Sequence, residues 1–245
     1  MAAPPRISLT RFFAFGDSLT WGQDGQDDGA TPLAFHTFVK VNVPYPADLQ
    51  LLLGFRYTQQ VNLFGVLNEG CPGEEAGSTK PSPCEGASNA VARFGQVVRG
   101  GTYDAALIME GSNDVGEIPG DALAEDRAVA ALQSMIDYAK LFNIRPYLAT
   151  IPPQNPNGGV PSRVKGAAFV QSFNARLNSL ALAEGIPLVD VYSNIDSSML
   201  APDGLHLRQV GYDKVAHVFL DKLAATAEFS TSSFGAAALK ARPAK

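Results

Sequence analysis

Hydrophobic and polar positions along the chain follow two different spacings. Short apolar runs, typical of buried strands, alternate with longer segments in which apolar residues recur at helical intervals. The predicted strands are Phe12–Phe15, Gln60–Leu67, Ala105–Met109, Pro146–Ile151 and Pro187–Val191. The predicted helices are Pro46–Leu53, Ala87–Val98, Ala122–Phe142, Arg163–Glu184 and Val210–Ala227. This alternation predicts a doubly wound α/β fold with a five-stranded, mainly parallel sheet.

Three segments fall outside this alternation. Residues 22–44 form a long insertion after the first strand, and its aromatic residues either shape a pocket wall or only pack the loop onto the body. A loop rich in Pro, Gly and Asn at 152–161 follows the fourth strand, at the sheet edge where ligands normally bind. The small-residue segment 230–245 is expected to be a flexible tail. Because no repeat or second composition regime is present, we expect one domain over residues 1–229.

Composition and charge exclude several kinds of partner. The chain has 245 residues, 46% of them hydrophobic, which is enough to bury a substantial core without metals or disulfides. Its formal net charge of -5 provides no positive field for phosphate backbones, so we expect no nucleic-acid partner. No apolar run approaches the roughly 20 residues that span a bilayer, and the first residues lack the apolar middle of a signal peptide. We therefore expect a soluble protein without integral membrane association.

The only cysteines, Cys71 and Cys84, lie in a stretch rich in Gly, Pro, Glu and Ser. They form either a loop-closing disulfide, as in an exported protein, or two free thiols of a reducing cytoplasm. Export to the periplasm or the exterior would require a leader removed from the sequence. Two cysteines without a nearby histidine cannot complete a tetrahedral site, so we expect no metal.

Polar residues directly follow two of the predicted strands, where ligands bind in an open parallel sheet. After the first strand, Gly16 permits a tight exit and Ser18 can open the next helical turn beside free backbone N–H groups. That serine could equally be a helix cap or part of a phosphate loop. After the third strand, Asn113 can donate its amide N–H toward a developing oxyanion and Asp114 can brace the loop. By itself this second segment is an ordinary strand-to-turn sequence.

The most specific element is Asp203-Gly204-Leu205-His206, which precedes the last predicted helix. A separation of three residues on a turn lets the Asp203 carboxylate orient the His206 imidazole through one nitrogen. The other nitrogen is then free to take a proton from a serine. His217 falls among apolar residues of the last helix, and His36 lies in the insertion with no acid at matching spacing. His206 is therefore the candidate base.

Four motifs occur together in a fixed order: GDSL at 16–19, a glycine block at 68–74, GSND at 111–114 and DGLH at 203–206. In these motifs, over about residues 11–225, the chain resembles the SGNH (GDSL) hydrolases. Four ordered motifs with suitable intervals are far more specific than any one of them.

The resemblance implies a flavodoxin-like three-layer α/β/α sandwich that binds no cofactor. It implies that Ser18 attacks an ester carbonyl, with His206 as base and then acid and Asp203 holding its tautomer. The backbone N–H groups of Ser18 and Gly73 and the side-chain amide of Asn113 would hold the oxyanion.

Three glycines are candidates for the oxyanion site. Gly65 and Gly70 compete with Gly73 for the oxyanion site, although the spacing from the preceding asparagine favours Gly73. A glycine is needed there because a side chain would keep the substrate from the backbone N–H. Asp17 and Asp114 are expected to brace the catalytic groups from behind.

The function that these residues predict is a serine ester hydrolase acting on short-acyl, small-molecule esters through an acyl-enzyme. Lysophospholipase, thioesterase and carbohydrate acetylesterase activities are the alternatives within the family. A flavin-binding carrier and a non-catalytic domain on the same fold are further alternatives. A flavin carrier would have no use for the Asp203 and His206 pair. The complete triad argues against a non-catalytic domain. The oligomeric state stays open.

Overall fold

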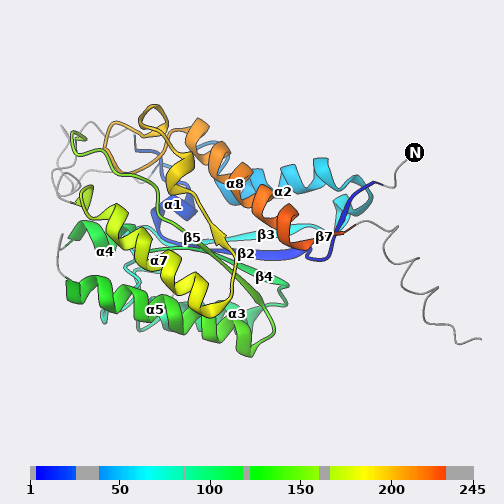
Figure 1. Cartoon of the computed structure of the whole chain (residues 1–245), viewed down its shortest axis with the longest axis horizontal. Coiled ribbons are helices and arrows are strands. Elements are labelled where there is room, and N and C mark those ends of the chain that lie inside the picture. The colour runs from blue at the N-terminus through cyan, green and yellow to red at the C-terminus, as the bar shows by residue number, and fades with distance from the viewer. Residues whose placement is uncertain (1–3, 26–38, 85, 118–121, 160–165, 230–245) are drawn as a thin grey trace, which may run out of the picture.

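The computed structural model describes residues 4–25, 39–84, 86–117, 122–159 and 166–229. Its main sheet has five strands, all parallel, in the order β3-β2-β4-β5-β6 (Figure 1). The strands are β2 (Arg11–Gly16), β3 (Gly65–Gly70), β4 (Ala105–Met109), β5 (Arg145–Ala149) and β6 (Leu188–Val189). This is the flavodoxin-like strand order, in which the connections change direction between β2 and β4; in such folds ligands bind in the crevice outside these carboxyl ends. The predicted fold class is confirmed.

Helices cover both faces of the sheet (Figure 1). One face carries α2 (Tyr45–Arg56) and α8 (Gln209–Ala227). The other face carries α3 (Ala90–Gly100), α5 (Ala122–Leu141) and α7 (Val170–Glu184). Because both faces are buried, the central strands β2 and β4 are almost continuously apolar instead of alternating with polar residues.

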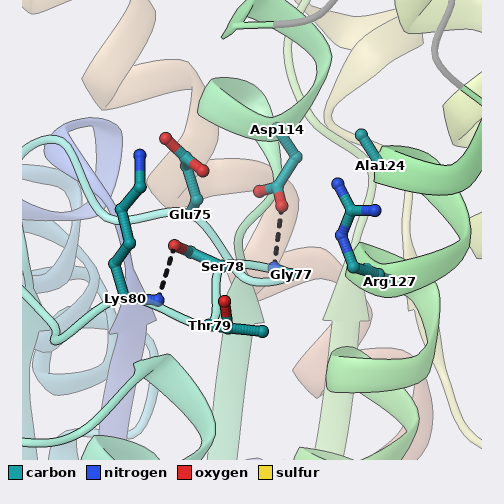
Figure 2. A pocket seen from close by; sticks show the side chains of 8 residues that line it. All are labelled: Glu75, Gly77, Ser78, Thr79, Lys80, Asp114, Ala124 and Arg127. Carbon is teal, nitrogen blue, oxygen red and sulfur yellow. Dashed lines mark hydrogen bonds between the residues drawn. The ribbon is translucent and has the colours of Figure 1, made fainter.

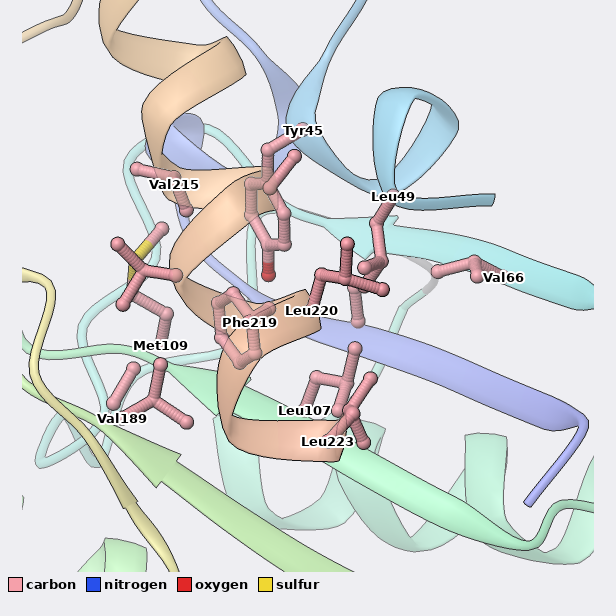
Figure 3. Packing of buried hydrophobic residues seen from close by; sticks show 14 of the residues in the cluster. Tyr45, Leu49, Val66, Leu107, Met109, Val189, Val215, Phe219, Leu220 and Leu223 are labelled. Carbon is pink, nitrogen blue, oxygen red and sulfur yellow. The ribbon is translucent and has the colours of Figure 1, made fainter. Parts of the chain in front are cut away.

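Successive residues of β2, β4 and β5 enter opposite hydrophobic cores. In β2, Phe12 packs into the core under α2 and α8, whereas Phe13 packs into the core under α3, α5 and α7. Figure 3 shows the first of these cores, where Leu107 of β4 lies among side chains of the two helices. Tyr45 and Phe219 stack there with ring centroids 5.2 Å apart. The two cores fix the sheet from both sides and so fix the positions of the strand ends.

The second strand begins later than the sequence predicts. Residues Thr58–Leu63 form a 3-10 helix, η2, and β3 starts only at Gly65. Gln60 anchors η2 to β1 (Arg6–Ile7), because its side chain accepts a hydrogen bond from the N–H of Ile7 and donates to the Ile7 carbonyl oxygen, at 2.9 and 3.0 Å. The side-chain amide of Gln60 thus bonds to the Ile7 backbone as a neighbouring strand would, although the backbone of Gln60 is helical.

Several short elements were not predicted. They are α4 (Ser112–Glu117), η3 (Tyr192–Asn194), η4 (Ser197–Met199) and a two-stranded antiparallel sheet of β1 (Arg6–Ile7) and β7 (Glu228–Phe229). The helical turn expected at Ser18 is present as α1 (Ser18–Trp21). The small sheet lies at the end of the molecule opposite α1 (Figure 1). Each of these elements is too short to show a hydrophobic period in the sequence.

Parts of the sequence predictions concern residues outside the described ranges. Most of the insertion, 26–38, and the tail, 230–245, are among them, so the expectations for both stay predictions. At the described ends of the insertion, Gln23 pairs with Lys40 in an antiparallel bridge. A disulfide links Cys71 and Cys84. Among the described residues, no helix has the length and apolar content needed to cross a membrane.

Glu110 is a fully buried acid at the carboxyl end of β4. It is 0% exposed, and neither of its carboxyl oxygens has a hydrogen-bond partner among the described residues. Burial, and then the negative charges of Asp17, Glu74 and Asp114, raise the pKa of Glu110 well above its usual value, while Arg93 acts in the opposite direction. The neutral acid is therefore the favoured form of Glu110 in the folded protein.

The raised pKa makes the contribution of Glu110 to stability depend on pH. The unfolded carboxyl ionises near pH 4.3, whereas the folded one keeps its proton to higher pH, so stability is lost as pH rises between the two pKa values. This loss amounts to as much as about 1.4 kcal/mol per pH unit. Glu110→Gln cannot ionise and escapes the loss.

We expect urea unfolding at several pH values to give Glu110→Gln an advantage over wild type that is smallest near pH 4 and grows toward pH 7. A difference in the free energy of unfolding that stays constant over this range would contradict the assignment of a neutral Glu110.

Candidate active site

The carboxyl end of β2 places Ser18 at the crevice. The strand ends at Gly16, Asp17 caps α1 by accepting a hydrogen bond from the N–H of Leu19 at 2.8 Å, and Ser18 is the first helical residue. Only glycine fits at position 16, because a Cβ atom there would lie 2.2 Å from the carbonyl oxygen of Met109. This close approach of β2 and β4 lets the chain turn sharply into α1.

Two distant segments of the chain meet at Ser18. The Nε2 atom of His206 lies 2.8 Å from the Ser18 Oγ, across a sequence separation of 188 residues. The other ring nitrogen, Nδ1, is hydrogen-bonded to Oδ2 of Asp203. The second Asp203 oxygen accepts the backbone N–H groups of Leu205 and His206, both at 3.0 Å. The structure therefore brings Ser18, His206 and Asp203 together in a chain of hydrogen bonds.

The turn that carries Asp203 and His206 is held by the loop after β5. Gly204 has a φ of +80°, and a Cβ atom there would lie 2.7 Å from the carbonyl oxygen of Asn155. Backbone hydrogen bonds run from the N–H of Asn155 to the Gly204 oxygen and from the N–H of Gly159 to the Pro202 oxygen. The described part of the Pro/Gly/Asn loop thus fixes the turn from outside.

Asp203 is the charged member of this group. Burial alone would raise the pKa of Asp203, but the hydrogen bond and charge of His206, with the backbone N–H groups, lower it below its usual value. An ionised carboxylate only accepts hydrogen bonds, so the Nδ1 of His206 must carry the hydrogen. In the neutral imidazole, the lone pair on Nε2 then faces the Ser18 hydroxyl and can take its proton.

Asn113 and Asp114 of α4 hold the loop that follows β3. The side-chain amide of Asn113 donates to the carbonyl oxygen of Glu74 at 2.8 Å. Asp114 accepts the backbone N–H groups of Ala76 and Gly77 at 2.9 and 2.7 Å. Since β4 and β2 are neighbours, α4 brings this loop to the same edge of the sheet as Ser18.

The three candidate glycines lie in different places. Gly65 pairs with Arg11 at the amino end of β2, about 16 Å of strand away from the crevice. Gly70 pairs with Gly16, but its N–H is hydrogen-bonded to the side chain of Asn68. Gly73 lies beyond the strand with a φ of +79°, and its N–H has no acceptor among the described residues. Gly73 therefore remains the best candidate for an oxyanion donor.

Open space adjoins the loop beside Asp114. A pocket of about 350 Å³ lies there, and Figure 2 shows the residues that line it: Glu75, Gly77, Ser78, Thr79, Lys80, Asp114, Ala124 and Arg127. A second cavity of about 210 Å³ reaches Gly73 and shares Glu75, Ser78 and Lys80 with the first. The side of Gly73 that faces the 75–80 loop is thus open.

Two charged residues next to this loop form a buried pair that the sequence did not predict. Arg93 of α3 and Glu74 form an ion pair in which both side chains are 1% exposed. The available signal was the position of Arg93 on the apolar face of its helix, among Ala90, Phe94 and Val97. A charged residue at such a position is rarely buried unless it is paired.

Similar structures share the fold. A carbohydrate acetylesterase, Est24, from Sinorhizobium meliloti is 15% identical with a TM-score of 0.69, covering 88% of this chain and 99% of that one. An aryl esterase from M. smegmatis is 17% identical with a TM-score of 0.70 and covers the same shares. LAE5, an α/β hydrolase from the metagenome of Lake Arreo in Spain, is 21% identical with a TM-score of 0.63, covering 88% and 95%.

Sequence comparison identifies the family. No curated protein matches the chain. The profile of the GDSL-like lipase/acylhydrolase family matches residues 14–214, which include the GDSL, GSND and DGLH motifs. The match covers most of the chain, and the chain therefore belongs to the GDSL-like lipase/acylhydrolase family.

Proposed function

We propose that the protein is a serine esterase that cleaves short-acyl carboxylic esters through an acyl-enzyme on Ser18. The observation that carries this proposal is the contact of 2.8 Å between the Ser18 Oγ and the His206 Nε2, with Asp203 behind the imidazole. Membership of an acylhydrolase family supports the same class of reaction.

In the first half of the proposed reaction, the Ser18 Oγ attacks the ester carbonyl while His206 removes the hydroxyl proton. The tetrahedral intermediate collapses, the bond to the alcohol oxygen breaks, and His206 protonates the departing alcohol. In the second half, His206 takes a proton from water, the water oxygen attacks the acyl-enzyme, and the acid leaves as Ser18 recovers its proton. Asp203 stabilises the imidazolium that forms in each half.

The proposed oxyanion donors are the N–H groups of Ser18 and Gly73 and the side-chain amide of Asn113. Such donors act on the charge that develops in the transition state, and losing one typically costs about 10² to 10³ in kcat. In this proposal Asp17 positions Ser18 by capping α1, and Asp114 positions the Gly73 loop through Ala76 and Gly77.

The preference for short acyl groups rests on two arguments. The net charge of -5 offers no attraction to an anionic lipid surface. Two solved structures with this fold are, by their descriptions, a carbohydrate acetylesterase and an aryl esterase. An acetylated sugar is therefore the second candidate substrate.

We also propose one catalytic domain over residues 1–229 and an oxidising compartment. Two cores that share one sheet support the single domain. The disulfide between Cys71 and Cys84 supports export, because disulfides persist mainly outside the cytoplasm.

Replacing Ser18 with Ala is expected to lower kcat on p-nitrophenyl acetate and butyrate by at least about 10³-fold, because no other group in the triad can form the acyl-enzyme. The matched control is Ser179→Ala, which removes an exposed hydroxyl on α7 and is expected to leave turnover unchanged. Full activity in a folded Ser18→Ala protein would contradict the proposal.

A series of p-nitrophenyl esters from two to sixteen carbons tests the substrate class. We expect kcat/KM to be highest at two to four carbons and to fall with length. A maximum at long chains would favour lysophospholipid or lipid esters, and faster cleavage of acetylated sugars or of acyl thioesters would favour those substrates instead.

A further inference from the structure

One buried guanidinium joins the strand that carries Ser18 to the loop that carries Gly73. Arg93 of α3 is 1% exposed and lies 3.9 Å from the ring centroid of Phe15 in β2. Its Nη1 donates to the carbonyl oxygen of Glu69 at 3.0 Å, and its Nη2 donates to that of Gly16 at 3.3 Å. Its Nε donates to both carboxylate oxygens of Glu74 at 3.0 Å.

The partners of Arg93 are next to the proposed catalytic groups. Gly16 is two residues before Ser18 on the same tight turn. Glu74 directly follows Gly73, and its carbonyl oxygen accepts the amide of Asn113. The Glu74 carboxylate also accepts the hydroxyl of Ser82, within the loop closed by the Cys71–Cys84 disulfide. A movement of Glu74 would therefore shift Gly73 and Asn113 relative to Ser18.

Stability alone does not account for this ion pair. Removing two charges from water costs several kcal/mol per ion, and well-packed apolar residues of similar size often serve a fold as well or better. The planar fork of arginine offers five N–H donors in fixed directions, which suits one side chain that must meet a carboxylate and two carbonyl oxygens. Lysine has a single ammonium group and cannot reach these three partners in the same geometry.

We propose that Arg93 and Glu74 are positioning residues of the esterase, which hold the Gly73 N–H and the Asn113 amide in place relative to Ser18. This inference rests on the proposed function, because it assigns a role within the same reaction. It predicts that disturbing Arg93 weakens the transition state more than substrate binding, since oxyanion donors act mainly on the charge that develops during attack.

Arg93→Lys tests this role against Val97→Ala as the matched control. Val97 is buried on α3 one turn further along and contributes to the core without a hydrogen bond to the loop. The assay uses p-nitrophenyl acetate well below the Tm of both variants. We expect Arg93→Lys to lower kcat by about 10²-fold, a loss that a displacement of about 1 Å can cause, with KM changed less than about twofold. We expect Val97→Ala to keep the wild-type kcat.

A double-mutant cycle with Asn113→Ala separates positioning from general weakening of the fold. If Arg93 acts through the oxyanion donors, Arg93→Lys has a much smaller effect on kcat when Asn113 is already missing. Independent, multiplicative effects on kcat would contradict the proposal.

Hydrogen exchange gives a readout that does not need turnover. We expect Arg93→Lys to speed amide exchange in residues 71–77 while residues 105–109 of β4 keep the wild-type rate; Val97→Ala should not have this local effect. Unchanged exchange in residues 71–77 would overturn the proposed role of Arg93, even if the protein has no esterase activity. Absence of Ser18-dependent hydrolysis in the wild type would contradict only the proposed function. If Arg93→Lys does not fold, Glu74→Gln serves the same exchange measurement.

Discussion

The hydrogen bond between the Ser18 hydroxyl and the His206 imidazole depends on the geometry of a parallel sheet. Ser18 and His206 are 188 positions apart in the chain. They meet because β2 and β6 both end at the same edge of the sheet, from which the chain continues to each residue. Helices pack the sheet on both faces, so the strand ends cannot shift without disturbing one of the two cores. The edge of the sheet at β2 and β4 is therefore rigid, and the short turns that leave it hold the candidate catalytic residues.

Several charged or ionisable side chains are buried next to this edge of the sheet. Asp17, Glu74, Glu110 and Asp114 are all buried near one another, and Arg93 is paired with Glu74 among them. Such a group costs folding free energy, because each ion leaves water and like charges repel. Hydrogen bonds to backbone groups offset part of that cost at Asp17 and Asp114, and loss of charge offsets it at Glu110. The interior under the site is thus more polar than its apolar strands suggest.

The sequence predicted the five-stranded sheet because buried parallel strands leave continuous apolar runs, as in Ala105–Met109, whose bounds match β4. It also predicted the residues that the structure brings together, since Ser18 follows a strand and Asp203 and His206 follow a turn signal. It favoured Gly73 over Gly65 and Gly70 by spacing alone, because strand register decides that Gly65 and Gly70 lie at opposite ends of β3 and that Gly73 lies beyond the strand. It missed η2 and the pair of Arg93 with Glu74, because both depend on partners far away in the chain: Ile7 for Gln60, and the strand ends for Arg93.

The most direct measurement is a crystal structure of the wild-type protein after reaction with an alkyl fluorophosphonate, whose tetrahedral phosphorus stands in for the tetrahedral carbon of the intermediate. We expect a covalent bond from phosphorus to the Ser18 Oγ, with a phosphoryl oxygen within hydrogen-bonding distance of the Gly73 N–H and the Asn113 amide. A phosphonate on another side chain, or one on Ser18 whose oxygen points away from both donors, would contradict the proposed mechanism.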